Sequence, residues 1–276
     1  RGPGLHHQDE PSGALHAAPV LSKKRNNEDD RHRREGGTGK STLAALIIRW
    51  LSERKSRSIL AVDADSNVNL NDLLGVRLKE TIGAIREEMR TRISDLPGGM
   101  TKQQFLEYKI QTSLVEGPDF DLIAMGRPEG PGCYCYANNL LQDILRTLAG
   151  NYDYVVIDNE AGMEHLSRRT SQVIDYLLVV SDATTRGIAT AGKISRLLKE
   201  LETRIGRRYL VLNRVSGPLP GPVEAAIREE NFALLAAIPE DTALLKMDGE
   251  GIPIRSMAAD SPARLAVGRM MDGLNL

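Results

Sequence analysis

The sequence predicts an α/β fold with a doubly wound, mostly parallel β-sheet. Short, continuously apolar runs, such as residues 58–62 and 154–157, alternate with longer segments of helical periodicity. Strands that are apolar on both faces are typical of parallel sheets covered by helices on both sides. With 276 residues, 41% of them hydrophobic, the chain can form one large domain of this kind.

Composition excludes several classes of function. The formal net charge of −1 argues against a general nucleic-acid binder, which usually carries a strong basic excess. No apolar run approaches the roughly 20 residues of a membrane span, and the N-terminus lacks the apolar stretch of a secretory signal. The two cysteines do not form a disulfide framework. We therefore expect a cytoplasmic protein whose partners include neither nucleic acid nor membrane.

The first 35 residues differ from the rest of the chain. They hold four of the five histidines, several prolines and glycines, and the mixed charge run KKRNNEDDRHRRE. Such a composition buries too little apolar surface to offset the entropy of ordering. We expect residues 1–35 to be disordered or foreign to the fold, and residues 36–276 to form the domain.

The apolar patterns place the expected elements of that domain in order. A glycine loop at 36–42 opens a helix at 41–54, whose apolar positions recur at helical spacing. After it we expect, in chain order, a strand at 58–62, a helix-rich insertion at about 76–116, a strand at 120–125, a helix through Leu140 and Leu145, strands at 154–157 and 176–180, a helix through Ile194 and Leu198, a strand at 209–212, a helix at 223–229, a strand at 233–238 and a short C-terminal helix.

Polar or reactive residues follow the expected strands. In parallel sheets, ligands bind at the carboxyl ends of the strands. The residues that fall there are Asp65, Cys133, Asp158, Asn213 and Pro239. This edge of the sheet is therefore the expected site.

The glycine loop has the chemistry of a phosphate site. Its residues are Gly36, Gly37, Thr38, Gly39, Lys40, Ser41 and Thr42. The glycines allow closely spaced backbone N–H groups, Lys40 supplies charge for the β- and γ-phosphates, and Ser41 can bind magnesium. The alternative is a glycine turn that happens to precede a helix, but such a turn rarely ends in Gly-Lys-Ser-Thr.

Two features before the loop depart from this pattern. A phosphate-binding loop of this type has glycine where the chain has Arg34. It also follows a buried strand, whereas the segment before it reads RNNEDDRHRR. A run of charges cannot form a central strand of a parallel sheet. The first strand is therefore expected to be missing.

Three aspartates at strand ends suit phosphoryl transfer. Asp63 and Asp65 follow the second strand of the pattern, and Asp158 closes the apolar run YDYVVI. Carboxylates placed there can hold magnesium-bound water and orient an attacking water. The alternative is that they are ordinary acids at strand ends or helix caps.

Cys133 and Cys135 lie in a glycine- and proline-flanked loop, EGPGCYCYANN. A disulfide across this spacing would be strained. Two thiolates are half of a tetrahedral sulfur site, and a symmetric dimer could supply the other half. The alternative is a pair of small buried residues.

These motifs together resemble the MinD/ParA class of dimeric P-loop ATPases. The resemblance rests on the glycine loop, the DAD after the second strand, and the segments VIDNEAG, LVLNRV and IPED. Within that class, GRPEGPGCYCYANNLL and VVIDNEAGMEHLSRRT are similar to the CooC-type carbon monoxide dehydrogenase maturation proteins. The resemblance runs from Gly36 to about Pro253.

The resemblance implies a role for each matching position. Residues 36–42 would bind ATP, with Lys40 on the phosphates and Ser41 on Mg²⁺. Asp65 would position the hydrolytic water, and Asp63 and Asp158 would lie in the magnesium shell. The residues implied for adenine recognition are Asn213 and the backbone around Pro239, Glu240 and Asp241. Cys133 and Cys135 would bind Ni²⁺ or Zn²⁺ across a homodimer that serves carbon monoxide dehydrogenase as its client.

One position departs from the resemblance. The class carries a signature lysine just before the glycine pair, where this chain has Glu35. A carboxylate facing a triphosphate adds repulsion where neutralisation is needed. We hypothesise a frameshift or a mis-assigned gene start upstream of Gly36, with a degenerate gene as the second possibility. The alternative functions are a positioning ATPase of the MinD/ParA kind, an iron–sulfur carrier, and a catalytically impaired nucleotide or metal binder.

Overall fold

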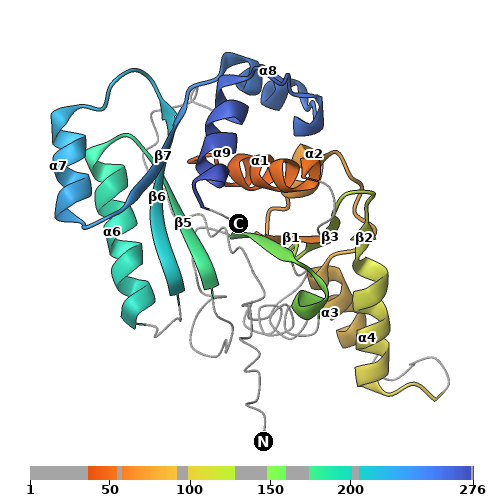
Figure 1. Ribbon diagram of the computed structural model, residues 1–276. Coiled ribbons are helices and arrows are strands. Elements are labelled where there is room, and N and C mark those ends of the chain that lie inside the picture. Colours follow the sequence, from red (N-terminus) through yellow and green to blue (C-terminus); the bar gives the residue numbers. More distant parts are fainter. Residues whose placement is uncertain are drawn as a thin grey trace, which may run out of the picture.

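The computed structural model describes residues 37–54, 58–91, 99–127, 148–159, 174–200, 205–274 and 276. This part of the chain contains both helices and strands, and they alternate from β5 to α8 (Figure 1). The expectations for residues 1–36, for the helix through Leu140 and Leu145 and for the loop of Cys133 and Cys135 lie outside the described residues.

The strands form a mostly parallel arrangement, as predicted. They are β1 (Ile59–Ala64), β2 (Val115–Glu116), β3 (Asp121–Ala124), β4 (Tyr154–Asn159), β5 (Ile174–Asp182), β6 (Ile205–Val215) and β7 (Leu234–Pro239). Only the short pair β2–β3 is antiparallel among the pairs of the described strands.

Hydrogen bonding divides the described strands into two sheets rather than one. The first has the order β2-β3-β1-β4, and the second has the order β5-β6-β7. Within the described residues, β4 therefore pairs only with β1, and β5 pairs only with β6. All six residues of β4 are nevertheless buried. Within the described residues, the two sheets share one core with the helices that pack on them.

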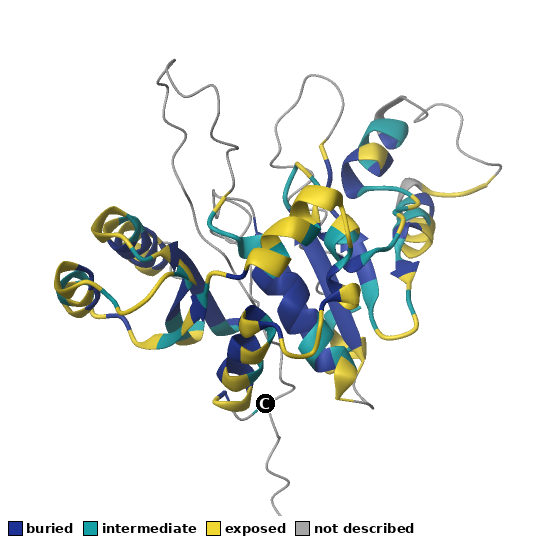
Figure 2. Ribbon diagram, turned by 90° about the horizontal axis from the view of Figure 1, so that it is seen from above, coloured by how far each residue is buried: buried dark blue, intermediate teal, exposed yellow. Residues whose placement is uncertain are grey.

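The helices lie on the outside of these sheets (Figure 2). They are α1 (Lys40–Glu53), α2 (Leu70–Leu74), α3 (Ile82–Thr91), α4 (Lys102–Ser113), α6 (Thr185–Glu200), α7 (Gly221–Glu229), α8 (Thr242–Glu250) and α9 (Pro262–Asp272), with the 3₁₀ turns η1 (Ala149–Asn151) and η3 (Ile254–Ser256). Helices α3 and α4 lie in the range predicted as a helix-rich insertion.

The prediction of one short C-terminal helix is wrong, because two helices follow β7. Helix α8 ends at Gly251, whose φ of 66° is the left-handed conformation that terminates helices. Helix α9 begins anew at Ser261, whose side chain accepts a hydrogen bond from the Arg264 N–H, and Pro262 occupies the first turn. Gly251 thus ends the first helix, and Ser261 with Pro262 begins the second.

Helices α1 and α9 bridge the two sheets on one face. Their apolar residues form one core with Val156 of β4 and Val180 of β5. The alternate residues of the strands face the other side: those of β5 pack on α6 and α7, and those of β1 pack on α3 and α4. Burying each Leu or Ile side chain of α1 stabilises the folded state by about 1.5–3 kcal/mol relative to leaving it exposed. Helix α1 therefore both joins the sheets and begins at the glycine loop.

Candidate functional site

The start of α1 has backbone donors without side-chain partners. Its N-cap is Gly39, with φ 81° and ψ 29°, and among the described residues no side chain caps this helix end or places an acid in its first turn. By contrast, Thr101, Asp241 and Ser261 cap α4, α8 and α9 with their side chains. Unpaired N–H groups and the positive end of the helix dipole attract an anion.

A hollow of about 420 Å³ lies at this helix start, which we call the loop hollow. Its volume is within the range of small-molecule pockets. The predicted site residues that line it are Gly37, Gly39, Lys40, Ser41, Thr42 and Asp65. The structure thus brings the loop and the carboxylate after β1 together, while Gly36 lies outside the described residues.

Asp158 lies behind the loop hollow, at the end of β4. It is 1% exposed, and its carboxylate accepts a hydrogen bond from the Ser41 hydroxyl. Burial raises the pKa of Asp158 to about 7; the Ser41 hydrogen bond and the Lys40 charge oppose this, and the charges of Asp63 and Asp65 reinforce it. A cation bound here would relieve the cost of the buried charge.

Asp63 has a different environment, although it is the register partner of Asp158 on the neighbouring strand. Its carboxylate accepts backbone hydrogen bonds from Asp65, Asn69 and Leu70, at 3.0, 3.0 and 2.9 Å. Burial raises its pKa, and these N–H groups partly offset the effect. These bonds fix the turn after β1, which positions Asp65. A role in the magnesium shell stays a prediction for Asp63.

Two buried polar atoms at this site have no partner. In the described residues, the buried side-chain oxygens and nitrogens without a hydrogen bond are Thr38 Oγ1, Arg86 Nη1 and Asp158 Oδ1. The first belongs to the glycine loop and the third to the carboxylate that contacts Ser41. Buried polar groups without partners are costly and rare. Hydroxyl and carboxylate oxygens are also the ligands that Mg²⁺ prefers, so these residues fit a magnesium–phosphate group.

A second, narrow hollow of about 20 Å³ adjoins the loop, which we call the side hollow. It is lined by the residues implied for adenine recognition, namely Asn213, Pro239, Glu240 and Asp241, together with Gly39 and Thr42. Asn213 Nδ2 donates a hydrogen bond of 2.8 Å to the Thr38 carbonyl oxygen. A purine does not fit this volume, so side chains that line it must move before a base enters.

Asp241 also has a structural role that the sequence did not indicate. One carboxylate oxygen accepts the N–H groups of Ala243 and Leu244, and the other accepts the Ser261 hydroxyl and the Ala263 N–H. It therefore caps α8 and lies at the start of α9. Its backbone, rather than its carboxylate, is what remains to contact a nucleotide.

Other residues of the loop hollow were not predicted. They are Asn69, Asp72, Leu73, Arg214, Met247, Asp248, Gly251 and Ile252. Arg214 directly follows Asn213 at a strand end, which is a signal that the sequence did carry. The residues of α8 carry no such signal, because their position depends on how the last helices pack.

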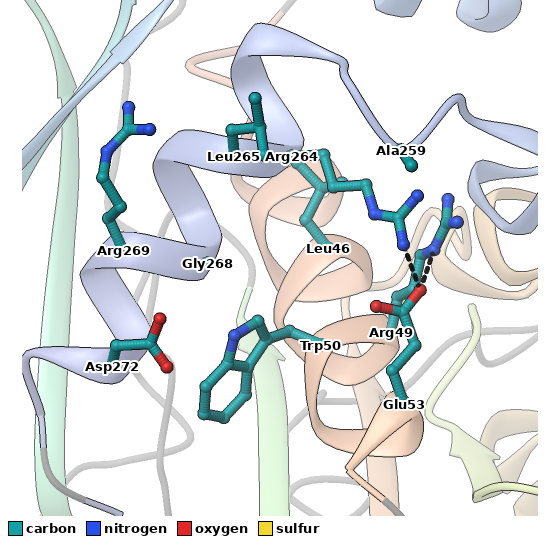
Figure 3. Close-up of a pocket in the computed structure, with 10 residues that line it drawn as sticks. All are labelled: Leu46, Arg49, Trp50, Glu53, Ala259, Arg264, Leu265, Gly268, Arg269 and Asp272. Carbon is teal, nitrogen blue, oxygen red and sulfur yellow. Dashed lines mark hydrogen bonds and ion pairs between the residues drawn. The ribbon is translucent and has the colours of Figure 1, made fainter.

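A third hollow, of about 280 Å³, lies between α1 and α9 (Figure 3). Trp50 and Leu265 line it, and two of its arginines are already paired, because Glu53 accepts from both Arg49 and Arg264 at 2.8 Å. It has no unpaired backbone donors from a helix start and no strand-end carboxylate. The loop hollow is therefore the better candidate for an anionic ligand.

Within the described ranges, no helix is both long and apolar enough to cross a membrane. This finding covers α9, which packs its apolar face against the domain core.

Comparisons with known proteins agree with this geometry. An uncharacterized ATP-binding protein of Methanocaldococcus jannaschii is 43% identical over 80% of this chain and 87% of its own length. The carbon monoxide dehydrogenase accessory protein CooC of Rhodospirillum rubrum is 28% identical over 79% of this chain and 86% of its own length.

Solved structures show the same fold. The cell division ATPase MinD of Pyrococcus furiosus matches with a TM-score of 0.65 and 22% identity, over 95% of this chain and 99% of that chain. MinD of Pyrococcus horikoshii, solved with Mg-ADP, matches with a TM-score of 0.64 and 22% identity, over 95% of this chain and 96% of that chain. The profile of the CobQ/CobB/MinD/ParA nucleotide binding domain matches residues 34–254. The chain belongs to the CobQ/CobB/MinD/ParA nucleotide-binding family.

Proposed function

We propose that this chain binds ATP with magnesium at the loop hollow and hydrolyses it. One observation carries the proposal: the uncapped start of α1 lies next to two buried oxygens without partners, Thr38 Oγ1 and Asp158 Oδ1. An anion on the helix start and a cation beside Asp158 would satisfy all of these groups together. Magnesium–triphosphate supplies both charges.

The residues have separate roles in this proposal. The loop N–H groups and Lys40 hold the β- and γ-phosphates, where they stabilise charge that develops during phosphoryl transfer. Ser41 and Asp158 hold Mg²⁺, which when bound neutralises phosphate charge. Asp65, on the turn fixed by Asp63, orients the attacking water.

Binding and turnover test the proposal separately. Titration calorimetry with ATP and MgCl₂ should give one site per chain, and Lys40→Ala should weaken binding and abolish turnover. Lys246→Ala is the matched control, because Lys246 is an exposed lysine whose ion pair, to Glu250, lies within α8. Equal affinity in the Lys40 variant and the wild type would contradict the proposed site.

We further infer that hydrolysis serves metal delivery by a cytoplasmic homodimer. Two features support this: the closely spaced Cys133 and Cys135 in the glycine-containing sequence EGPGCYCYANN, and a relative named as a carbon monoxide dehydrogenase accessory protein. Two thiolates from each subunit would bind Ni²⁺ or Zn²⁺ as cargo across the dimer. The client would be carbon monoxide dehydrogenase.

Metal content tests this part. The wild type should bind one Ni²⁺ or Zn²⁺ per dimer, measured by elemental analysis after equilibrium dialysis. Cys133→Ser and Cys135→Ser should each remove the metal while ATP binding persists, which shows that the variants fold. Unchanged metal stoichiometry in both variants would exclude the shared thiolate site.

Glu35 favours a second candidate, a nucleotide binder with impaired hydrolysis. Its carboxylate stands where the MinD/ParA class carries a lysine, so the charge at that position is reversed. The substitution Glu35→Lys should then raise ATP turnover, whereas the charge-conserving Glu35→Asp should leave it unchanged. Full turnover in the wild type would rule out the impaired form.

A further inference from the structure

Arg214 has an unusual backbone conformation at the carboxyl end of β6. Its φ is 56°, and the only other described residue besides glycine with positive φ is Asn231. Asparagine tolerates this left-handed region, whereas arginine pays a steric cost there. The register between β6 and β7 shifts between Leu212 and Val215, so Arg214 lies in a bulge. Bulges redirect side chains, and such strain is concentrated at functional sites.

The bulge places Arg214 between the two hollows. It lines both the loop hollow and the side hollow, as do Gly39, Thr42 and Asp248. The loop hollow contains the groups that would hold the terminal phosphates, and the side hollow contains Asn213 and Pro239. A nucleotide that joins these regions must pass Arg214 with its ribose and α-phosphate.

The charges around the loop hollow leave a role for this guanidinium. Three carboxylates line it, from Asp65, Asp72 and Asp248, against two cations, Lys40 and Arg214. Some arginines of the described chain, such as Arg49 and Arg264, are held in ion pairs. Arg214 is exposed and forms no ion pair within the described residues.

We propose that Arg214 binds the α-phosphate of a nucleotide whose terminal phosphates occupy the glycine loop. This inference rests on the proposed function. The guanidinium donates charge-assisted hydrogen bonds, which are stronger than neutral ones. It adds positive charge to a hollow that Asp65, Asp72 and Asp248 also line. The strained backbone is retained because it directs the side chain toward the ligand.

Arg214→Asn tests the role of the charge, because asparagine adopts the same backbone conformation. Affinities for ATP, ADP and AMP should each fall about tenfold, as expected for loss of one charge-assisted bond. The affinity for adenosine, measured by competition, should be unchanged. Arg228→Asn on α7 is the control, since Arg228 is exposed and lines neither hollow. A lower affinity for ATP and ADP with an unchanged affinity for AMP would overturn the α-phosphate assignment.

Arg214→Gly separates binding from a merely structural role. Glycine relieves the left-handed strain, so the denaturation midpoint should rise while nucleotide affinity falls. A stabilised variant with unchanged affinity would overturn the proposal and leave the proposed function intact. If the wild type itself binds no nucleotide, both are overturned.

Discussion

The side-chain amide of Asn213 donates a hydrogen bond of 2.8 Å to the carbonyl oxygen of Thr38. This bond joins the end of β6, in the three-stranded sheet, to the glycine loop that opens α1. A Cβ added to Gly39 would overlap the same amide. The conformation of the glycine loop therefore depends on the side chain of Asn213, which belongs to a strand far along the chain.

Gly39→Ala should destabilise the protein by about 1–3 kcal/mol, because φ is 81° and the new methyl group meets Asn213. Urea denaturation measures the loss. Gly37→Ala is the matched control, since an added Cβ there has no heavy atom within 4 Å. Adding Asn213→Ala to the Gly39 variant should recover part of the loss. If it recovers none, the overlap is not the cause.

Stability without nucleotide should fall as pH rises from about 4 to 7. Burial raises the pKa of Asp158 from 3.8 to about 7, so the folded state holds a proton that the unfolded state releases. This difference corresponds to about 4 kcal/mol lost across that window. Asp158→Asn has no charge to bury, so it should reduce this slope and be more stable than the wild type at pH 8, whereas Asp63, whose pKa burial also raises, keeps its share of the slope.

Denaturation midpoints at pH 5 and pH 8 measure this effect. Asp182→Asn is a suitable control, because Asp182 also ends a strand but is exposed. The Asp158 variant should also lose magnesium-dependent nucleotide binding. Parallel pH slopes for the wild type and the Asp158 variant would contradict the assignment.

Asp65→Asn should separate hydrolysis from binding. If the carboxylate orients the attacking water, kcat should fall about 10²–10⁴-fold, while the Kd for ATP changes little. Single-turnover phosphate release and calorimetry give the two quantities. Asp72→Asn removes a carboxylate that lines the same hollow but lies on α2, and should retain turnover. An equal fall in kcat in the Asp65 and Asp72 variants would indicate a general effect of charge in the hollow and contradict a specific role of Asp65.

Much of this site could be predicted because it depends on local chemistry. The glycine loop, the helix that follows it and the strand ends at Asp65, Asp158 and Asn213 are defined by short patterns. Parallel strands bring their carboxyl ends to one edge of the sheet, so residues at these ends are expected to lie near one another. The described chain confirms the parallel pairing and the hollow at the loop.

The other features of the fold and the site depend on tertiary contacts, which short sequence patterns do not specify. The left-handed Arg214 results from the register shift of β6 against β7, which sequence alone does not specify. The division of the described strands into two sheets depends on which edges pair. Short β2 has two residues, too few for a periodicity. The family resemblance implies that the backbone at Asp241 contacts a nucleotide, but the bond of its carboxylate to Ser261, at the start of another helix, depends on how the last helices pack.

The Asp241 cap gives a prediction at low pH. The Ser261 hydroxyl and the backbone N–H groups lower the pKa of Asp241, although burial, the largest single influence, acts in the opposite direction. A carboxylate with a lowered pKa stabilises the fold above its unfolded pKa of 3.8, and this contribution disappears as pH falls through the folded pKa.

Asp241→Ala removes two bonds to α8 and two at the start of α9, and should cost about 2–4 kcal/mol at pH 7. Ser261→Ala should cost less, because it removes the 2.6 Å bond to Asp241 and the cap of the Arg264 N–H. The double variant should be less destabilised than the sum, since the two residues share one network. Additive losses would mean that α8 and α9 are held independently. Coupled losses would mean that the Asp241 carboxylate links α8, which lines the loop hollow, to α9, which packs against both sheets.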